Sequence, residues 1–475
     1  MNFPNFIGPA YTARSPNQDS QRCVNLYLEK DESGGGKSPA MLVGTPGLTR
    51  FTTLATAGVR GLYTASGGRC FAVSGTVLYE LAAGGTATAR GTLVSTTGPV
   101  SMSDNGLQVI IVDGTTAGYL LTLGTNTFAA ITDDAFYGAD RVSVFDNYFV
   151  LNRPGTQQLY ISGLLDGAAY DGTDFASAES SPDLLVALEV ERRELLLLGT
   201  RSGEVWFDAG TVDFPFAPIS GTAFPFGCAA PHSLRTLAGQ FYWLAADKDG
   251  QGLVMCLEGY APQRISTFAL EFAIQNYSRI DDAIGYTMQR EGHSWYILSF
   301  PSGNATWAFD AATKMWFELA DLDSTTGLLI RHRVEHHCYA FNKHLVAGEQ
   351  DGRVYESSYS VFDQDGDALV RERTAPHIHN DRKLLYFSVL EVDLETGVGL
   401  DAGVIPGSDP QLMMQFSDDG GHTWSQERWV SAGKLGAYHA RAIWRRLGRA
   451  RQRAYRIRIS DPVRVVLLAA RLEGS

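Results

Sequence analysis

Charged residues are scarce in this sequence, and it lacks the features that direct a chain into or across a membrane. Only 19% of its 475 residues are Asp, Glu, Lys or Arg. The longest largely apolar runs, residues 107–112 and 465–468, are far shorter than the roughly 20 residues that a membrane-spanning helix needs. The first residues contain neither a basic nor an apolar segment. We therefore expect no secretory signal, no membrane span and folding in the cytoplasm.

Cysteine is also rare, and its positions show no pattern. The chain has five cysteines, which are widely scattered and include no Cys-x-x-Cys pair. An odd, scattered set is typical neither of a disulfide framework nor of a metal site. We therefore predict reduced, mostly buried thiols at Cys23, Cys70, Cys228, Cys256 and Cys338.

The charge that is present is unevenly distributed. The formal net charge is −13, yet residues 441–475 hold ten arginines against Asp461 and Glu473. This segment therefore carries +8, and the rest of the chain carries −21. An acidic body argues against general wrapping of DNA, because contacts to phosphate need clustered Lys and Arg.

Glycine, in contrast, is abundant, with 50 residues, and it marks a repeat. Seven times, a short apolar run is followed by a turn with glycine and a second apolar run, which indicates a β-hairpin. The turn glycines are 39 to 53 residues apart, at Gly75, Gly114, Gly155, Gly203, Gly250, Gly303 and Gly352. Propeller blades of four strands take about 40 to 50 residues each. The repeat predicts a β-propeller of six or seven blades over residues 51–365, with a pair of β-sandwiches as the alternative.

The regions on either side of the repeat differ from it. From residue 366 the hairpin period is lost and longer alternating stretches follow, among them residues 384–392 and 455–459. We therefore predict an all-β protein whose propeller is followed by a β-sandwich-like domain at residues 366–475. Residues 1–50 form an N-terminal arm, in which residues 23–29 are strand-like. Propellers commonly use a terminal strand to complete a blade made by the other end, so we expect a closing strand in this arm.

One motif in the C-terminal region has the form of a known turn. Ser417, Asp419, Gly421 and Trp424 belong to a stretch of the form Ser-x-Asp-x-Gly-x-Thr-Trp, which resembles the Asp-box of sialidases. In this pattern the Asp accepts hydrogen bonds from the turn, the Gly permits positive φ and the Trp packs against the strand. A sialidase-like enzyme would need several copies inside the propeller, and only one is present. We therefore predict a structural turn.

Histidines offer the best candidates for metal binding, but their spacing is unfavourable. His332, His336, His337, Cys338 and His344 lie close together in the sequence, and His377 and His379 share one strand face. Strong zinc motifs contain paired Cys or His-x-x-x-His elements, which are missing here. Gly-x-Ser-x-Gly and His-Glu-x-x-His are missing too. We expect no enzyme, no cofactor and structural or interface histidines, while a metal at residues 332–344 stays open.

The densest charged feature is an arginine-rich segment at residues 441–458, with eight arginines and no acid. Arg is preferred over Lys where bidentate contacts to carboxylate or phosphate matter. Three roles stay open: a strand face that pairs with acids of the same chain, a protein interface, and contact with DNA. As an interface, the segment would use Arg441, Arg445, Arg446, Arg449, Arg451 and Arg453.

Seven short sequence signatures remain, none of them catalytic. They lie at residues 25–29, 44–48, 174–183, 227–233, 265–267, 444–451 and 460–463 and extend over nearly the whole chain. Together they resemble one family, the tail-hub or packaged-DNA stabilisation proteins of short-tailed bacteriophages.

The resemblance implies a mechanical role in the virion tail, after synthesis and assembly in the host cytoplasm. Copies of the chain, six by what the family implies, would form a ring below the portal and its head-to-tail adaptor. The ring would close the DNA-filled head, with possible indirect contact with DNA. It would also carry the tail needle and the tailspikes or tail fibres.

Two other function classes remain as alternatives. One is a sialidase-like or other carbohydrate-active propeller enzyme, and the other is a free-standing propeller that binds partners.

Overall fold

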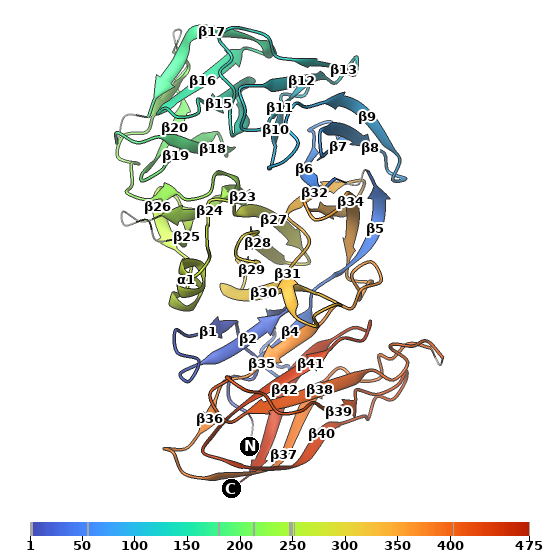
Figure 1. Cartoon of the computed structure of the whole chain (residues 1–475). Helices are drawn as coiled ribbons and strands as arrows, with labels where there is room; N and C mark the ends of the chain where they lie inside the picture. The colour runs from blue at the N-terminus through green and yellow to red at the C-terminus, as the bar shows by residue number, and fades with distance from the viewer. Residues whose placement is uncertain are drawn as a thin grey trace.

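The protein consists of a ring of small sheets with a β-sandwich attached to one side of it (Figure 1). A computed structural model gives the structure, and it describes residues 3–54, 57–178, 181–211, 214–246, 250, 252–401 and 403–474. Within these residues the ring contains seven blades, each built on an antiparallel sheet of four principal strands. The predicted all-β fold, a propeller followed by a β-sandwich, is confirmed.

The blades follow one another along the chain. Blade 1 consists of β6 (Val59–Thr64), β7 (Cys70–Ser74), β8 (Val77–Leu81) and β9 (Ala87–Thr92). Blade 2 consists of β10 (Ser101–Asp104), β11 (Gln108–Val112), β12 (Gly118–Thr122) and β13 (Thr127–Ala130). Blade 3 consists of β14 (Val142–Phe145), β15 (Tyr148–Asn152), β16 (Gln158–Gly163) and β17 (Asp166–Ser177). Blade 4 consists of β18 (Leu185–Glu191), β19 (Glu194–Gly199), β20 (Gly203–Asp208) and β21 (Phe216–Pro218).

The last three blades complete the ring. Blade 5 consists of β22 (Gly227–Cys228), β23 (Arg235–Leu237), β24 (Gln240–Ala246), β25 (Gly252–Glu258) and β26 (Ala261–Arg264). Blade 6 consists of β27 (Ile284–Arg290), β28 (His293–Phe300), β29 (Ala305–Asp310) and β30 (Met315–Leu322), with β31 (Leu329–Arg331) paired to β30. Blade 7 consists of β32 (His336–Ala340), β33 (Lys343–Ala347), β34 (Arg353–Ser358) and β5 (Gly47–Thr53).

The seven glycine-marked hairpins are the central hairpins of the seven blades. The second strand of a blade packs against neighbouring blades on both of its faces, so it is apolar almost throughout. All residues of β7 are buried, for example, and so are all but the first of β11. At the turn between β11 and β12, Gly114 adopts φ +78°, which glycine reaches without steric strain.

The ring is closed by β5, and not by residues 23–29 as predicted. β5 forms the outer edge of blade 7, where Thr53 lies opposite Arg353 and Gly47 lies opposite Ser358. Residues 23–29 instead supply the end of one strand and most of another to the sandwich. The prediction failed because both segments have strand-like sequences, and only the assembled ring shows which of them reaches blade 7.

The sandwich combines strands from both ends of the chain. One sheet has the order β3-β4-β42-β37-β40, and the other continues from blade 6 in the order β2-β35-β41-β38-β39. Short strands β1 and β36 pair with β2 and β41. The bounds are β1 (Tyr11–Thr12), β2 (Ser20–Val24), β3 (Leu26–Lys30), β4 (Ala40–Gly44), β35 (Arg371–Thr374), β36 (Ile378–His379), β37 (Leu385–Leu394), β38 (Gln411–Ser417), β39 (Arg428–Ser431), β40 (Ala442–Ala450), β41 (Gln452–Ile459) and β42 (Val466–Gly474).

Asn25 marks the point where the N-terminal arm passes from one sheet to the other. It lies between β2 and β3 with φ +53° and is fully buried. Its side-chain amide donates to the carbonyls of Ala320 and Val370, each at 2.8 Å, and its oxygen accepts from the Ala320 amide at 3.0 Å. Asn tolerates this left-handed conformation better than most residues. Asn25 therefore joins the arm, blade 6 and the start of the C-terminal region.

One hydrophobic cluster runs through the sandwich into the propeller. Tyr27 of β3 packs against Trp295 of blade 6 with ring centroids 5.1 Å apart, and the same cluster contains Tyr455 of β41. Helix is limited to α1 (Phe268–Gln275) and the single 3₁₀ turn η1 (Pro231–Ser233) among the described residues. Among the described residues, no helix is long and apolar enough to cross a membrane.

Candidate interaction surface on the sandwich

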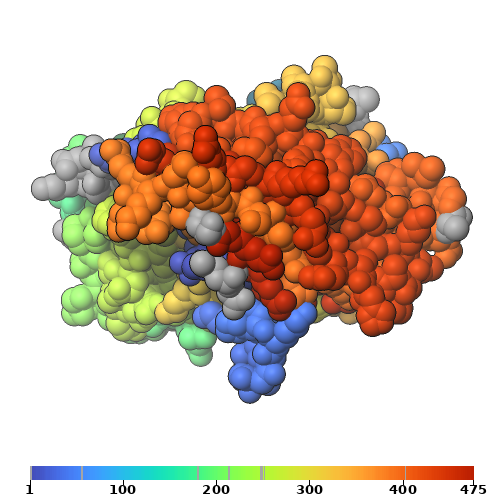
Figure 2. All heavy atoms as spheres, turned by 90° about the horizontal axis from the view of Figure 1, so that it is seen from below, coloured from blue at the N-terminus to red at the C-terminus, as the bar shows by residue number. Residues whose placement is uncertain are grey.

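The arginine-rich segment spans β40 and β41, which follow each other in the chain but belong to different sheets of the sandwich. The sandwich forms one end of the molecule, below the propeller in Figure 1 and seen from below in Figure 2. The side chains of Arg445, Arg446, Arg449 and Arg451 are exposed. We call these four residues the arginine surface. Arg451 donates to the carbonyl of Arg382 at 2.5 Å. Among the described residues, none of the four forms an ion pair with an Asp or Glu.

Local backbone geometry turns the arginine surface outward. Arg446 has φ +56° and Gly448 has φ +79°, and a register shift interrupts the pairing of β37 with β40 at the same level. The guanidinium of Arg428 in β39 donates to the carbonyl of Arg445 at 2.7 Å and braces this irregular segment. Such bulges bend a strand and re-aim its side chains. The arginine surface is thus held by ordered backbone rather than by a free tail.

Exposed aromatic side chains accompany the arginines. Tyr386 of β37 lies opposite Arg449 in the register and is 49% exposed. Trp429 of β39 is 59% exposed. Tyr, Trp and Arg are the residues most enriched at the energetic centres of protein interfaces. The sequence does not distinguish Tyr386 and Trp429 from buried aromatic residues, because an alternating strand pattern does not reveal which face stays open to solvent.

Arg441, at the start of the segment, is already paired. Its guanidinium forms two hydrogen bonds of 2.8 Å with the carboxylate of Glu391 on β37. The Arg441 side chain is 63% exposed, so solvent screens this pair and it contributes little to stability. Arg441 remains accessible, but its charge is largely compensated within the chain.

Arg453 is not a surface residue, and its prediction as part of an interface was wrong. Its side chain is only 2% exposed and forms a two-pronged ion pair with Asp418, at 2.6 and 2.7 Å. It also donates to the carbonyl of Leu447 and lies 4.0 Å over the ring of Phe416. Burial opposes its charge, but Asp418 holds the pKa of Arg453 above its ordinary value. The residue therefore belongs to the interior of the sandwich.

The last two arginines of the segment also face a partner within the chain. Arg456 and Arg458 approach the carboxylate of Glu372 on β35, at 3.6 and 2.7 Å, and Arg22 of β2 approaches it at 3.7 Å. The Glu372 side chain is fully buried. Burial favours its neutral form, yet the three guanidiniums hold its pKa below the ordinary value. This cluster ties the N-terminal arm to the C-terminal strands.

The Asp-box-like residues form a turn after β38. Asp419 accepts hydrogen bonds from the amide of Thr423, at 2.9 Å, and from the hydroxyls of Thr423 and Ser417. The amide of Gly421 donates to the Ser417 hydroxyl at 2.8 Å, and Gly421 has φ +92°. These bonds, first of all that from the Thr423 hydroxyl, lower the pKa of Asp419. Trp424 lies 3.6 Å below the guanidinium of Arg456.

The clustered histidines have separate environments. His332 contacts the side chain of Gln364, and His336 lies in the centre of the propeller. The rings of His337 and His344 stack with a 3.0 Å contact between Nε2 and Nδ1. His377 contacts the Pro16 carbonyl at 2.9 Å. Across the described residues, no three His, Cys, Asp or Glu side chains come together in a way that could hold a metal ion.

Family models match both parts of the chain. The model described as "Bacteriophage P22 Gp10, beta-propeller" matches residues 1–361, and the model described as "Bacteriophage P22 Gp10, beta-sandwich" matches residues 370–475. The fold thus defines a propeller-and-sandwich protein of the structural class found in phage tails. The chain belongs to the bacteriophage P22 Gp10 family, a family of podovirus tail-hub and stabilisation proteins. It is a structural phage tail protein that assembles with other virion components.

The chain is also similar to several solved structures at low identity. The WD40 β-propeller domain of Doa1 is 11% identical, with a TM-score of 0.42, over 66% of this chain and 97% of that one. A chain of the mitotic checkpoint complex is 10% identical, with a TM-score of 0.45, over 66% and 93%. YCF48 bound to D1 peptide is 12% identical, with a TM-score of 0.40, over 66% and 98%. No curated protein matches the chain.

Proposed function

We propose that this protein is the tail hub of a short-tailed phage and has no enzymatic activity. In this role, copies of the chain, six by what the family implies, form a ring below the portal and its head-to-tail adaptor. The ring closes the head, keeps packaged DNA inside it, and carries the tail needle and the tailspikes or tail fibres. The match to the P22 Gp10 family over both domains is the observation that carries this proposal.

The arginine surface supports an assembly role for the sandwich. Its four guanidiniums are exposed, and among the described residues none pairs with a carboxylate, although the chain as a whole carries −13. An acidic patch on the adaptor or on a neighbouring copy would complement it. Complementary charge mainly speeds and orients docking rather than adding large affinity. Contact with DNA is indirect in this proposal, since four arginines on one small face are too few for a DNA-wrapping site.

Because these arginines are exposed, they can be replaced without disturbing the interior of the sandwich, and this makes the proposal testable. We would replace Arg445, Arg446 and Arg449 together with Gln and measure the incorporation of the purified protein into DNA-filled heads that lack it. The expected result is a normal melting temperature, because these side chains form no ion pair within the described chain. Incorporation should fall strongly, and the heads should lose DNA.

A matched control separates loss of the surface from general loss of charge. Arg193 lies on the opposite part of the molecule, between β18 and β19, and its side chain is 79% exposed. Changing Arg193 to Gln should leave incorporation unchanged. Normal incorporation of the triple variant would exclude the arginine surface as the docking site, and wild-type protein that neither binds such heads nor retains their DNA would refute the hub role itself.

A further inference from the structure

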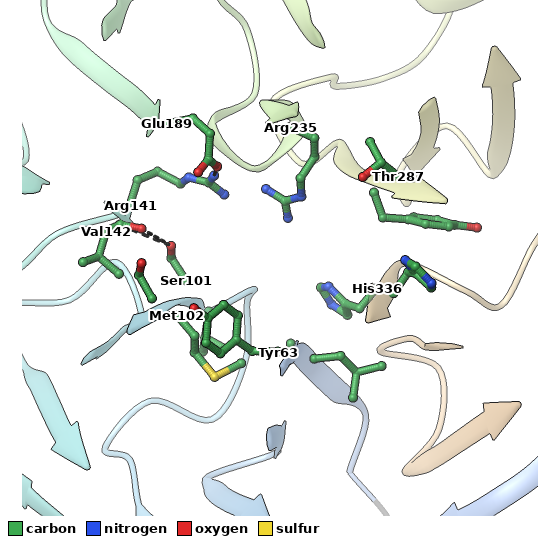
Figure 3. A pocket seen from close by; sticks show the side chains of 15 residues that line it. Tyr63, Ser101, Met102, Arg141, Val142, Glu189, Arg235, Thr287 and His336 are labelled. Atoms are coloured by element: carbon green, nitrogen blue, oxygen red, sulfur yellow. Dashed lines mark hydrogen bonds and ion pairs between the residues drawn. The ribbon is translucent and has the colours of Figure 1, made fainter. Parts of the chain in front are cut away.

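The first strands of the blades surround a cavity of about 320 Å³ at the centre of the propeller (Figure 3). Every one of the seven blades contributes to its wall. The polar side chains that face it come from different blades, so no single strand or loop defines the cavity. They include Ser101, Arg141, Glu189, Arg235, Thr287 and His336.

The cavity carries an excess of positive charge. Arg141 forms an ion pair with Glu189 across 2.6 Å. Arg235 has no such partner among the described residues, where its guanidinium donates only to the carbonyl of Leu234 at 2.8 Å. Burial, and then the charge of Arg141, lower the pKa of Arg235 to about 10, so the side chain stays charged at neutral pH. Two guanidiniums therefore face one carboxylate.

Hydrogen-bonding groups of the cavity are also unsatisfied. His336 is 6% exposed, and its Nε2 has no hydrogen-bond partner among the described residues, nor has Nε of Arg141. Figure 3 shows His336 and Arg235 directed into the cavity from different sides. Burial and the neighbouring Arg235 lower the pKa of His336 to about 3, so its ring is neutral at pH 7 and can donate one N–H bond. Buried polar groups without partners are rare and costly in native proteins.

We propose that the central cavity binds a small tetrahedral oxyanion of the phosphate class. Arg141, Arg235 and His336 approach from blades 3, 5 and 7, and donors that converge from several sides suit a tetrahedral anion better than a planar carboxylate. Guanidinium groups form strong, charge-assisted hydrogen bonds to phosphate oxygens. A bound anion would neutralise the charge of Arg235 and give partners to the orphaned nitrogens.

An adjoining hollow offers a path for the anion. This second hollow has a volume of about 760 Å³ and shares Thr287 and His337 with the central cavity. It also includes Tyr339, which is 52% exposed. The hollow thus adjoins the central cavity and is lined by residues of blades 4 to 7. Because the cavity is enclosed by the blades, it suits a small anion rather than a nucleic acid or a protein segment.

Calorimetric titration of the full chain with inorganic phosphate, at constant ionic strength, tests the proposal. Wild-type protein should bind one phosphate with saturation, sulfate should compete, and acetate should not. The variant Arg235→Met should bind at least tenfold more weakly, and His336→Gln should show a smaller loss. The control Arg193→Met, at an exposed arginine of the same propeller, should bind like wild type.

Thermal unfolding distinguishes loss of the phosphate-binding site from loss of the folded structure. Removing an unpaired buried charge should leave the melting temperature of Arg235→Met without phosphate equal to or above that of wild type. Phosphate should raise the melting temperature of wild type but not of this variant. No saturable binding to wild type, unchanged binding by Arg235→Met, or equal competition by acetate would overturn the proposal. If Arg235→Met does not fold, unchanged phosphate affinity in His336→Gln overturns it.

Discussion

Arg453 and Asp418 form a two-pronged ion pair within the sandwich, with Nε to Oδ1 at 2.6 Å and Nη2 to Oδ2 at 2.7 Å. The arginine is buried, whereas the aspartate is 40% exposed. The rings of Phe387 and Phe416 pack against the guanidinium plane, at 4.7 and 4.0 Å. Among the arginines of β40 and β41, this pair holds Arg453 inside the sandwich, whereas the arginine surface points outward and can meet a partner.

Arg453→Gln should therefore destabilise the fold rather than impair assembly alone. The change removes a charge-assisted pair and leaves the Leu447 carbonyl with a weaker donor. We expect a loss of roughly 2 to 3 kcal/mol in the free energy of unfolding, kept moderate by the exposure of Asp418. Chemical denaturation measures it. Arg446→Gln is the control and should change stability by less than about 0.5 kcal/mol; equal stability of the two variants would contradict the assignment.

Glu372 should make stability depend on pH. Because its pKa is lowered in the folded protein, it contributes stability above its unfolded pKa, and this contribution is lost as the pH falls through the folded pKa. Glu372→Gln leaves three guanidiniums without their shared partner and should cost about 3 to 5 kcal/mol at pH 7. The difference from wild type should narrow as the solution is made acidic.

Unfolding measured from pH 7 down to pH 3 checks this dependence. Glu391→Gln serves as the control, since its partner Arg441 is largely exposed, and it should leave stability near wild type at every pH. A constant difference between Glu372→Gln and wild type over the whole range would mean that the carboxylate is not ionised in the folded protein.

Variants of Asn25 test how much this residue stabilises the point where the N-terminal arm passes from one sheet of the sandwich to the other. Asn25→Ala removes three side-chain hydrogen bonds and puts at positive φ a residue that tolerates it less well than Asn, so we expect a loss of about 3 to 5 kcal/mol. Asn25→Gly removes the same bonds without the backbone strain and should lose about 1 kcal/mol less. Urea unfolding of both variants measures the two contributions. If Gly restored wild-type stability, the hydrogen bonds to Ala320 and Val370 would have no net value.

Two buried thiols lie on either side of the ring closure. Sγ of Cys70 in blade 1 and Sγ of Cys338 in blade 7 are 3.6 Å apart. The oxidant diamide should join them in a disulfide and be reduced to its hydrazine, so that three of the five thiols remain titratable in the denatured protein. Cys70→Ala should retain all four of its thiols under the same treatment. A similar loss of thiols in that variant would show that the reaction involves other cysteines.

Much of the architecture follows from local patterns. Each blade needs a second strand that is buried on both faces and a tight glycine turn after it, and both are encoded within about ten residues, as in β11 and Gly114. The placement of Arg453 was also within reach. In β41 it has the same parity as the apolar residues Tyr455 and Ile457, so strand alternation alone places it on the apolar side.

Other features depend on contacts between distant parts of the chain. The alternation of residues along a strand separates its two faces but does not show which face lies against solvent. Arg456 and Arg458 lie on the face of β41 opposite Tyr455, yet they are covered by Glu372 of β35, with which both form ion pairs. Likewise, the arginine-lined cavity was not foreseen, because Arg141, Arg235 and His336 are far apart in the sequence and meet only when the ring closes.

The sequence by itself determined that this protein is all-β, that its hairpins repeat at blade length, and that its basic charge gathers near the C-terminus. These properties depend on the order of neighbouring residues. The tertiary structure alone decided that β5 closes the ring, that the N-terminal arm joins the sandwich, and which arginines remain exposed. Each of these is settled by competition among similar strands and charges for the same partners, and only packing of the whole chain resolves that competition.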